Sequence, residues 1–219
     1  MGRMVVGLTA LVLLVTASAA VVVPAAGSRT AVAARAPQPR LLVLTLRDLP
    51  ESLPAFEQVE SYLDDNARAA RDTGGSVAEF AALGRLTGYH RSFDAKPERV
   101  SSEKTLVPSF VHHVESQANL YRSPAHARAR FRAQIAGPLP RGARLVVPTT
   151  RVGDEMIALR NTAPNPYLDR TLDNVFVISW RQGPVTAWLL VVGMKALVTL
   201  PDAIALARKQ ERRIEEALR

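Results

Sequence analysis

The sequence predicts an α+β domain in which helices pack against a single antiparallel sheet, with an apolar segment ahead of it. Three observations support this prediction. Two apolar strands flank a short Gly-containing turn over residues 175–192, helix-capping residues precede three apolar-periodic segments, and apolar residues make up 47% of the 219 residues. A chain of this length holds one ordinary domain plus a targeting segment.

Residues 1–26 have the layout of an export signal. Arg3 precedes an apolar run from Val5 to Val15, and Ala17-Ser18-Ala19 offers the small residues that signal peptidase requires. Apolar residues resume at 20–23, so a retained membrane anchor is the alternative. An organellar transit peptide fits less well, because the apolar block is not amphipathic. Cleaved or anchored, the domain is expected outside the cytoplasm, either secreted or held at the membrane.

Residues 27–40 lack an apolar period and end in Pro37-Gln38-Pro39-Arg40, so we expect a disordered linker there and the folded domain over 41–219. The net charge of +8 is concentrated early in the chain, because residues 1–47 hold five Arg and no acid. The rest carries 23 basic and 20 acidic residues, which argues against a nucleic-acid partner. The absence of Cys excludes a bacterial lipid anchor on an N-terminal Cys.

The first half of the domain is predicted from periodicity and capping. Apolar residues three or four positions apart predict a helix over 54–72, which Gly74-Gly75 ends. Ser76 and Glu79 form a capping box for a short helix over 77–83. Alternating residues predict strands over 84–93 and 105–115.

The second half contains two further helices. Ser123 followed by Pro124 starts a helix to Ile135, with Ala127, Phe131 and Ile135 as its buried stripe. Strands over 145–147 and 154–160 follow. After the hairpin, a capping box of Thr199 and Asp202 starts the last helix, Leu200–Leu218.

The hairpin is the clearest element. With Gln182-Gly183 as its two-residue loop, Trp180 pairs with Val185 and Trp188 pairs with Val177. The two tryptophans then lie on opposite faces. Because both faces are largely apolar, the hairpin should be central in the sheet, with cover on each side. The helices 123–135 and 200–218 are the expected cover, on the same side or on opposite sides.

Four short segments carry a resemblance to a group of exported bacterial proteins. They are Asp48-Leu49-Pro50, Gly84-Arg85-Leu86-Thr87-Gly88-Tyr89, Gly153-Asp154-Glu155 and Leu206-Ala207-Arg208-Lys209-Gln210. The element order is similar to that of PsbP-like domains and LpqN-type envelope lipoproteins, and more distantly to extracellular sensor domains of bacterial Ser/Thr kinases. The resemblance implies an α+β sandwich outside the membrane and no known reaction. The lipobox Cys of the lipoproteins and the disulfides of the kinase sensors are missing.

Catalytic and metal-binding signatures are weak. His112 and His113 are strand neighbours that point to opposite faces, although His90 could meet one of them across paired strands. No GxSxG elbow supports a serine hydrolase, and Asp154-Glu155 is ordinary turn chemistry at a strand entry. Gly84 and Gly88 fit no phosphate loop, and Gly88 beside Tyr89 favours the close approach of another backbone or side chain instead. We expect no cofactor, no metal and no catalytic residues.

One charge asymmetry remains in the domain, because residues 116–153 hold seven Arg and no acid. Arg128, Arg130 and Arg132 fall off the buried helix stripe and form a predicted basic patch, suited to anionic lipid head groups or envelope polymers. A second candidate site is a ligand cleft near Arg85, Tyr89 and Trp188.

Two functions are therefore carried forward. The first is a non-enzymatic module of the cell envelope that binds an envelope protein, a lipid head group or a small ligand. The alternative is a secreted hydrolase whose site is assembled from distant residues. It requires a His bonded to a Ser, Asp or Glu inside a concave pocket.

Overall fold

The structure is a computed structural model that describes residues 37–50, 56–95, 111–166 and 170–219. The expected signal or anchor, and the expected linker up to residue 36, lie outside these residues. Across the described ranges, no helix has the length and apolar character needed to span a membrane.

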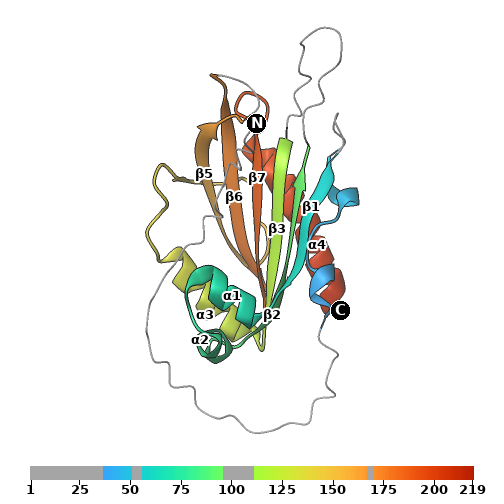
Figure 1. The fold of residues 1–219 in the computed structure, drawn as a ribbon, viewed down its shortest axis with the longest axis vertical. Helices are drawn as coiled ribbons and strands as arrows, with labels where there is room; N and C mark the ends of the chain where they lie inside the picture. The colour runs from blue at the N-terminus through green and yellow to red at the C-terminus, as the bar shows by residue number, and fades with distance from the viewer. Residues whose placement is uncertain (1–36, 51–55, 96–110, 167–169) are drawn as a thin grey trace, which may run out of the picture.

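Seven antiparallel strands form one sheet in the order β1-β2-β3-β7-β6-β5-β4, which confirms the predicted α+β class (Figure 1). The strands are β1 (Glu57–Asp64), β2 (Arg85–Asp94), β3 (Val111–Tyr121), β4 (Arg144–Val146), β5 (Glu155–Pro164), β6 (Leu172–Gln182) and β7 (Val185–Met194).

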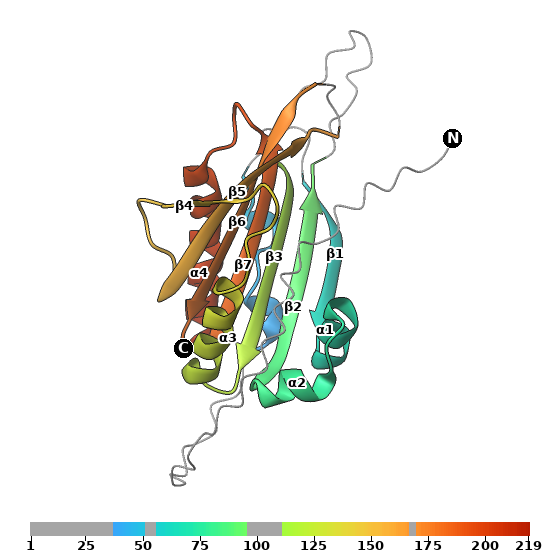
Figure 2. The same cartoon turned by 90° about the vertical axis from the view of Figure 1, so that its left-hand side faces the viewer.

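Helices cover the two faces of the sheet unequally. α4 (Leu200–Leu218) lies along one face, which we call the α4 face. The other, the α3 face, carries α1 (Asn66–Thr73), α2 (Val77–Ala82) and α3 (Pro124–Ile135) at one end of the sheet (Figures 1 and 2). The main core lies under α4, and its fully buried side chains include Phe93, Val114, Ile178, Trp180, Leu189 and Ile214.

The residues just before β1 complete the core on the α4 face. Between two 3₁₀ turns (Pro39–Leu41 and Leu46–Asp48), the side chains of Leu42, Val43 and Leu44 are fully buried. Gln210 of α4 donates to the Leu42 carbonyl at 3.3 Å, and Lys209 donates to the Asp48 carbonyl at 2.6 Å. This N-terminal strap, residues 39–50, is thus fastened to the last helix.

The hairpin is central as predicted, since β7 is the fourth of the seven strands and β6 lies beside it. Trp180 pairs with Ala187 and Trp188 pairs with Ser179, so the two tryptophans lie on opposite faces. The predicted register was wrong by two residues, because the loop is Gly183-Pro184 and Gln182 pairs with Val185. Pro184 has no N–H for the ladder, and Gly183 adopts a φ of 53°, which favours the turn at these two residues.

The predicted helix over 54–72 was also wrong in its first half. Residues 57–64 form the edge strand β1, and the helix begins only after Asp65, whose side chain accepts a hydrogen bond from the backbone N–H of Arg68. An edge strand with one solvated face needs no strict alternation of apolar residues. The spacing of Val59 and Leu63 therefore matched the period of a buried helix stripe by coincidence. Both side chains are in fact exposed, at 43% and 52%.

Capping signals were the most reliable part of the prediction. Ser76 and Thr199 cap α2 and α4 in capping boxes, and Ser123 accepts from the backbone of His126 at the start of α3. On α3 the stripe is shorter than expected: Ala127 and Phe131 are buried, whereas Ile135 is 39% exposed. The predicted strand over 105–115 corresponds to β3, and its residues 105–110 lie outside the described ranges.

Candidate functional site

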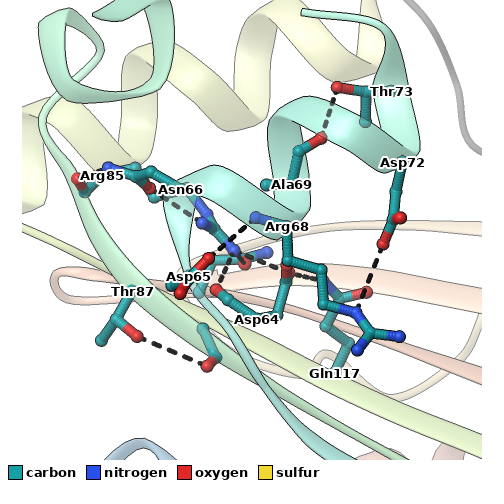
Figure 3. Close-up of polar contacts among 12 residues, drawn as sticks. Asp64, Asp65, Asn66, Arg68, Ala69, Asp72, Thr73, Arg85, Thr87 and Gln117 are labelled. Carbon is teal, nitrogen blue, oxygen red and sulfur yellow. Dashed lines mark hydrogen bonds and ion pairs between the residues drawn. The ribbon is translucent and has the colours of Figure 1, made fainter. Parts of the chain in front are cut away.

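Arg85 lies in a buried polar network between β1, β2 and β3. It donates to Asp64 Oδ2 at 2.6 Å, to Asn119 Oδ1 from two nitrogens at 2.7 and 3.1 Å, and to Asn66 Oδ1 at 2.9 Å. Figure 3 shows Asp64 and Asn66 around its guanidinium group. A Cβ on Gly88 would lie 2.4 Å from Asn119 Oδ1, so the predicted close approach is real. Burial raises the pKa of Asp64 even though the Arg85 charge opposes the rise.

The network reaches Trp188 but not Tyr89. Trp188 donates from its indole N–H to Gln117 at 2.7 Å, and Gln117 donates to Asp64 at 2.6 Å. Tyr89 lies on the α4 face, where its hydroxyl contacts that of Ser61 at 3.0 Å. The predicted trio is therefore split between the faces. Arg85 is only 4% exposed and its donors bind protein groups, so this network holds the strands together and offers no free guanidinium.

The histidines have partners on the strands and at a helix end. His113 contacts Asp94 at 2.6 Å with Nδ1 and Glu115 at 2.9 Å with Nε2. A neutral imidazole has one N–H, so only the imidazolium satisfies both carboxylates. Burial acts to lower the pKa of His113, but the hydrogen bonds to Asp94 and Glu115 prevail and raise the pKa to about 9. At neutral pH this cluster therefore holds its proton.

The other three histidines are dispersed. His112 contacts Asp173 at 2.8 Å, His90 stacks on Tyr62 with ring centroids 4.8 Å apart, and His126 contacts the cap residue Ser123 at 2.7 Å. His90 pairs with Gln117 and does not meet His112 or His113 in the register. Within the described ranges, no group of three ligating side chains is arranged to hold a metal ion.

The open site is a depression of about 750 Å³ where α3 meets the ends of β5 and β6. Its lining contains four arginines, two carboxylates and one glycine: Arg128, Arg132, Arg151, Arg181, Asp154, Glu155 and Gly153. No histidine or aromatic residue lines it. The four arginines exceed the two carboxylates by two positive charges, so the depression favours an anion.

Glu155 organises the arginines of this depression. Its two oxygens accept from Nε of Arg128 at 3.1 Å and from Nε of Arg132 at 3.2 Å, and Arg181 donates at 3.1 Å. Burial acts to raise the pKa of Glu155, but hydrogen bonds from Arg132 and Arg181 outweigh it and keep the pKa below its usual value. The carboxylate is therefore ionised at neutral pH and neutralises one guanidinium charge.

The two helix arginines keep binding capacity despite this contact. The side chain of Arg128 is 53% exposed and that of Arg132 is 66% exposed. Each donates to Glu155 through Nε, and both side chains line the depression. Arg181 differs, because its side chain is 3% exposed and also binds Asp154 at 2.7 Å. Arg181 is therefore a buried, ion-paired residue at the base of the depression.

The loop before β5 is held tightly in place. Gly153 has a φ of 63°, and a Cβ there would lie 2.5 Å from the Arg181 carbonyl oxygen, so no other residue fits without displacement. Its N–H donates to Glu211 of α4 at 2.6 Å. The segment 153–155, which sequence alone assigned to turn chemistry, thus fixes Glu155 beneath α3.

The structure brings two members of the predicted basic patch together and separates the third. Arg128 and Arg132 share the depression, whereas Arg130 is half-buried and bonded to the hydroxyl of Tyr121. Arg151 and Arg181 join the site without having been singled out for it. Arg151 lies within the acid-free segment, which could have indicated it, but Arg181 carried no signal in the sequence.

The chain has no match that assigns it to a protein family. No protein-family model matches the chain, and no curated protein matches it significantly. Among solved structures, it is similar to the extracellular domain of PknH from Mycobacterium tuberculosis, at 8% identity and a TM-score of 0.41. The match covers 74% of this chain and 85% of that domain. No match supports the expected PsbP-like or LpqN-type likeness. A likeness at this level carries no information about ligands.

Proposed function

We propose that this chain is a non-enzymatic extracytoplasmic binding module and that its ligand carries an anionic group, which the arginine-lined depression binds. The observation that carries the proposal is the pair Arg128 and Arg132, which contact one carboxylate, that of Glu155, while more than half of each side chain stays exposed. The export-like layout of residues 1–26 supports the extracytoplasmic location.

The chemistry of the depression favours phosphate-like or carboxylate ligands. Guanidinium groups present planar pairs of donors that match two anionic oxygens, and they stay charged at any physiological pH. Glu155 and Asp154 limit the excess charge, so the site selects compact anions and is not a general polyanion surface. The ion pairs from Glu155 to Arg128 and Arg132 also reduce the side-chain freedom lost on binding.

The hydrolase alternative has less support at this site. His112 and His113 contact carboxylates, which meets half of the geometric requirement. The depression, however, is lined by Arg, Asp, Glu and Gly and contains no histidine or serine that could act as base or nucleophile. We therefore favour binding over hydrolysis.

Calorimetric titration of the protein with inorganic pyrophosphate tests the proposal. We expect saturable binding that weakens by about tenfold or more in the double variant Arg128→Gln/Arg132→Gln, since charge-assisted contacts are lost. Arg47→Gln/Arg71→Gln, at two exposed arginines outside the depression, removes the same two charges and should leave the affinity unchanged. Equal affinity in Arg128→Gln/Arg132→Gln, or no saturable binding by the parent protein, overturns the proposal.

A further inference from the structure

The connection between α3 and β5 exposes an unusual share of apolar surface. Among the described residues, 13 large apolar side chains are exposed, and four of them fall within residues 135–147. Val147 is 91% exposed, Leu145 58% and Leu139 43%, with Ile135 at the end of α3. Isolated exposed apolar residues are ordinary, whereas four in one short segment concentrate apolar surface along this part of the chain.

The same connection is basic, and it includes β4, the edge strand of the sheet. Arg141, Arg144 and Arg151 are exposed, and no acidic residue occurs between 116 and 153. In Figure 2 the yellow segment after α3 projects beyond the β4 side of the molecule. Exposed Leu and Val beside exposed Arg are the combination that binds a lipid–water interface, where apolar groups enter the acyl boundary and arginines meet phosphates.

We propose that the segment 135–151 docks the domain on a bilayer that contains anionic lipids. The inference rests on the proposed function, because a lipid phosphate is then the anion that Arg128 and Arg132 bind beside the docked segment. A soluble polyanion would use the arginines but would leave the apolar side chains in water. The charge of the segment is complementary to an anionic head-group layer.

The connection is also suited to this role in its backbone. Three prolines, Pro138, Pro140 and Pro148, restrict it, and Gly142 turns it with a φ of 81°. Asn161 of β5 donates to the Arg141 carbonyl at 3.4 Å and anchors the turn to the sheet. The segment that carries these apolar side chains is therefore restrained by its prolines, by the turn at Gly142 and by β4, which lowers the entropy lost on docking.

A single fluorescent label reports docking at this place in the whole chain, because the sequence has no cysteine. Val147→Cys and Glu216→Cys would each be labelled with an environment-sensitive dye. The second site is exposed on α4, outside the proposed docking segment. Each labelled protein is mixed with vesicles of phosphatidylglycerol and phosphatidylcholine, or of phosphatidylcholine alone. An apolar N-terminal segment that enters the bilayer acts equally on both proteins, so the comparison isolates the docking segment.

We expect the dye at 147 to gain intensity about twofold or more and to shift to the blue on the anionic vesicles only, as for insertion into the interface. The dye at 216 should not respond. Leu139→Ser/Leu145→Ser should weaken this response about tenfold and leave pyrophosphate binding intact, because both side chains are exposed.

A dye at 147 that stays in water on anionic vesicles overturns the docking inference. If pyrophosphate still binds, the proposed function stands with a soluble anion as ligand. If the dye inserts and pyrophosphate does not bind, docking is supported and the anion site in the depression is rejected.

Discussion

Arg128 and Arg132 lie one helical turn apart on α3 and contact different oxygens of a single carboxylate, that of Glu155. This arrangement keeps two positive charges adjacent that would otherwise repel each other. It also means that Glu155 occupies the inner donors of both guanidinium groups. The carboxylate therefore has two opposing effects on an incoming anion, because it orders the arginines and also competes for them.

Glu155→Gln should raise the affinity for pyrophosphate by about fivefold, because one negative charge beside the bound anion is removed and the amide oxygen can still order one arginine. Calorimetric titration at neutral pH measures the change. Glu216→Gln makes the same charge change on α4 and should have no effect. A weaker affinity in Glu155→Gln would show that ordering outweighs competition and that the site depends on an intact Glu155.

Trp180→Ala should lower the free energy of unfolding by about 3–5 kcal/mol, since the side chain is fully buried under α4. Trp188→Ala should cost less, because Trp188 is only half-buried and contributes a hydrogen bond to Gln117. Urea unfolding followed by circular dichroism measures both. A loss below about 1 kcal/mol for Trp180→Ala would be incompatible with a core position.

Stability should fall as pH rises from 6.5 towards 9. The folded pKa of His113 is about 9 and its ordinary value is 6.5, so the folded state binds the extra proton in this window. The stabilisation is complete below pH 6.5 and is lost by pH 9, with a magnitude on the order of 3 kcal/mol. Urea unfolding at pH 6.5 and pH 9 tests this. In His113→Gln, the free energy of unfolding should differ little between pH 6.5 and pH 9. A difference as large as that of the parent protein would assign the effect to another group.

His90 should act in the opposite direction. Burial lowers its pKa, so below pH 6.5 the unfolded chain takes up a proton that the folded protein resists. The free energy of unfolding should therefore decrease as pH falls below 6.5. His90→Gln should reduce this acid sensitivity, measured by the same unfolding series. An acid branch identical to that of the parent protein would show that His90 is not the group responsible.

Local signals in the sequence predicted the elements, and contacts between distant residues explain the failures. The caps Ser76, Ser123 and Thr199 act within three residues, so they were readable. The prediction that Trp180 and Trp188 lie on opposite faces was confirmed although the predicted register was wrong. A shift of two residues leaves each side chain on the same face of the sheet. The edge strand 57–64 was missed because its pairing with β2, and not its own pattern, makes it a strand.

The site was predictable only in part, because it too depends on contacts between residues that are distant in the sequence. Arg128 and Arg132 follow from an acid-free segment with helical spacing. Their counterpart Glu155 lies 23 or more residues away, and Arg181 comes from a strand that reads as a core element. Tyr89 and Trp188 were both expected near one cleft, where the helices meet the sheet. The register places them on opposite faces, and no local pattern encodes that pairing.

The fastening of the N-terminal strap to α4 has a consequence for how the chain reaches its fold. Gln210 bonds the Leu42 carbonyl across 168 positions, and Ile214 completes the core that Leu42–Leu44 begin. During synthesis, the apolar α4 face stays uncovered until the ribosome has released nearly all of the described chain. Contacts of such long separation form slowly, so the nascent protein should depend on chaperones that shield this face until α4 arrives.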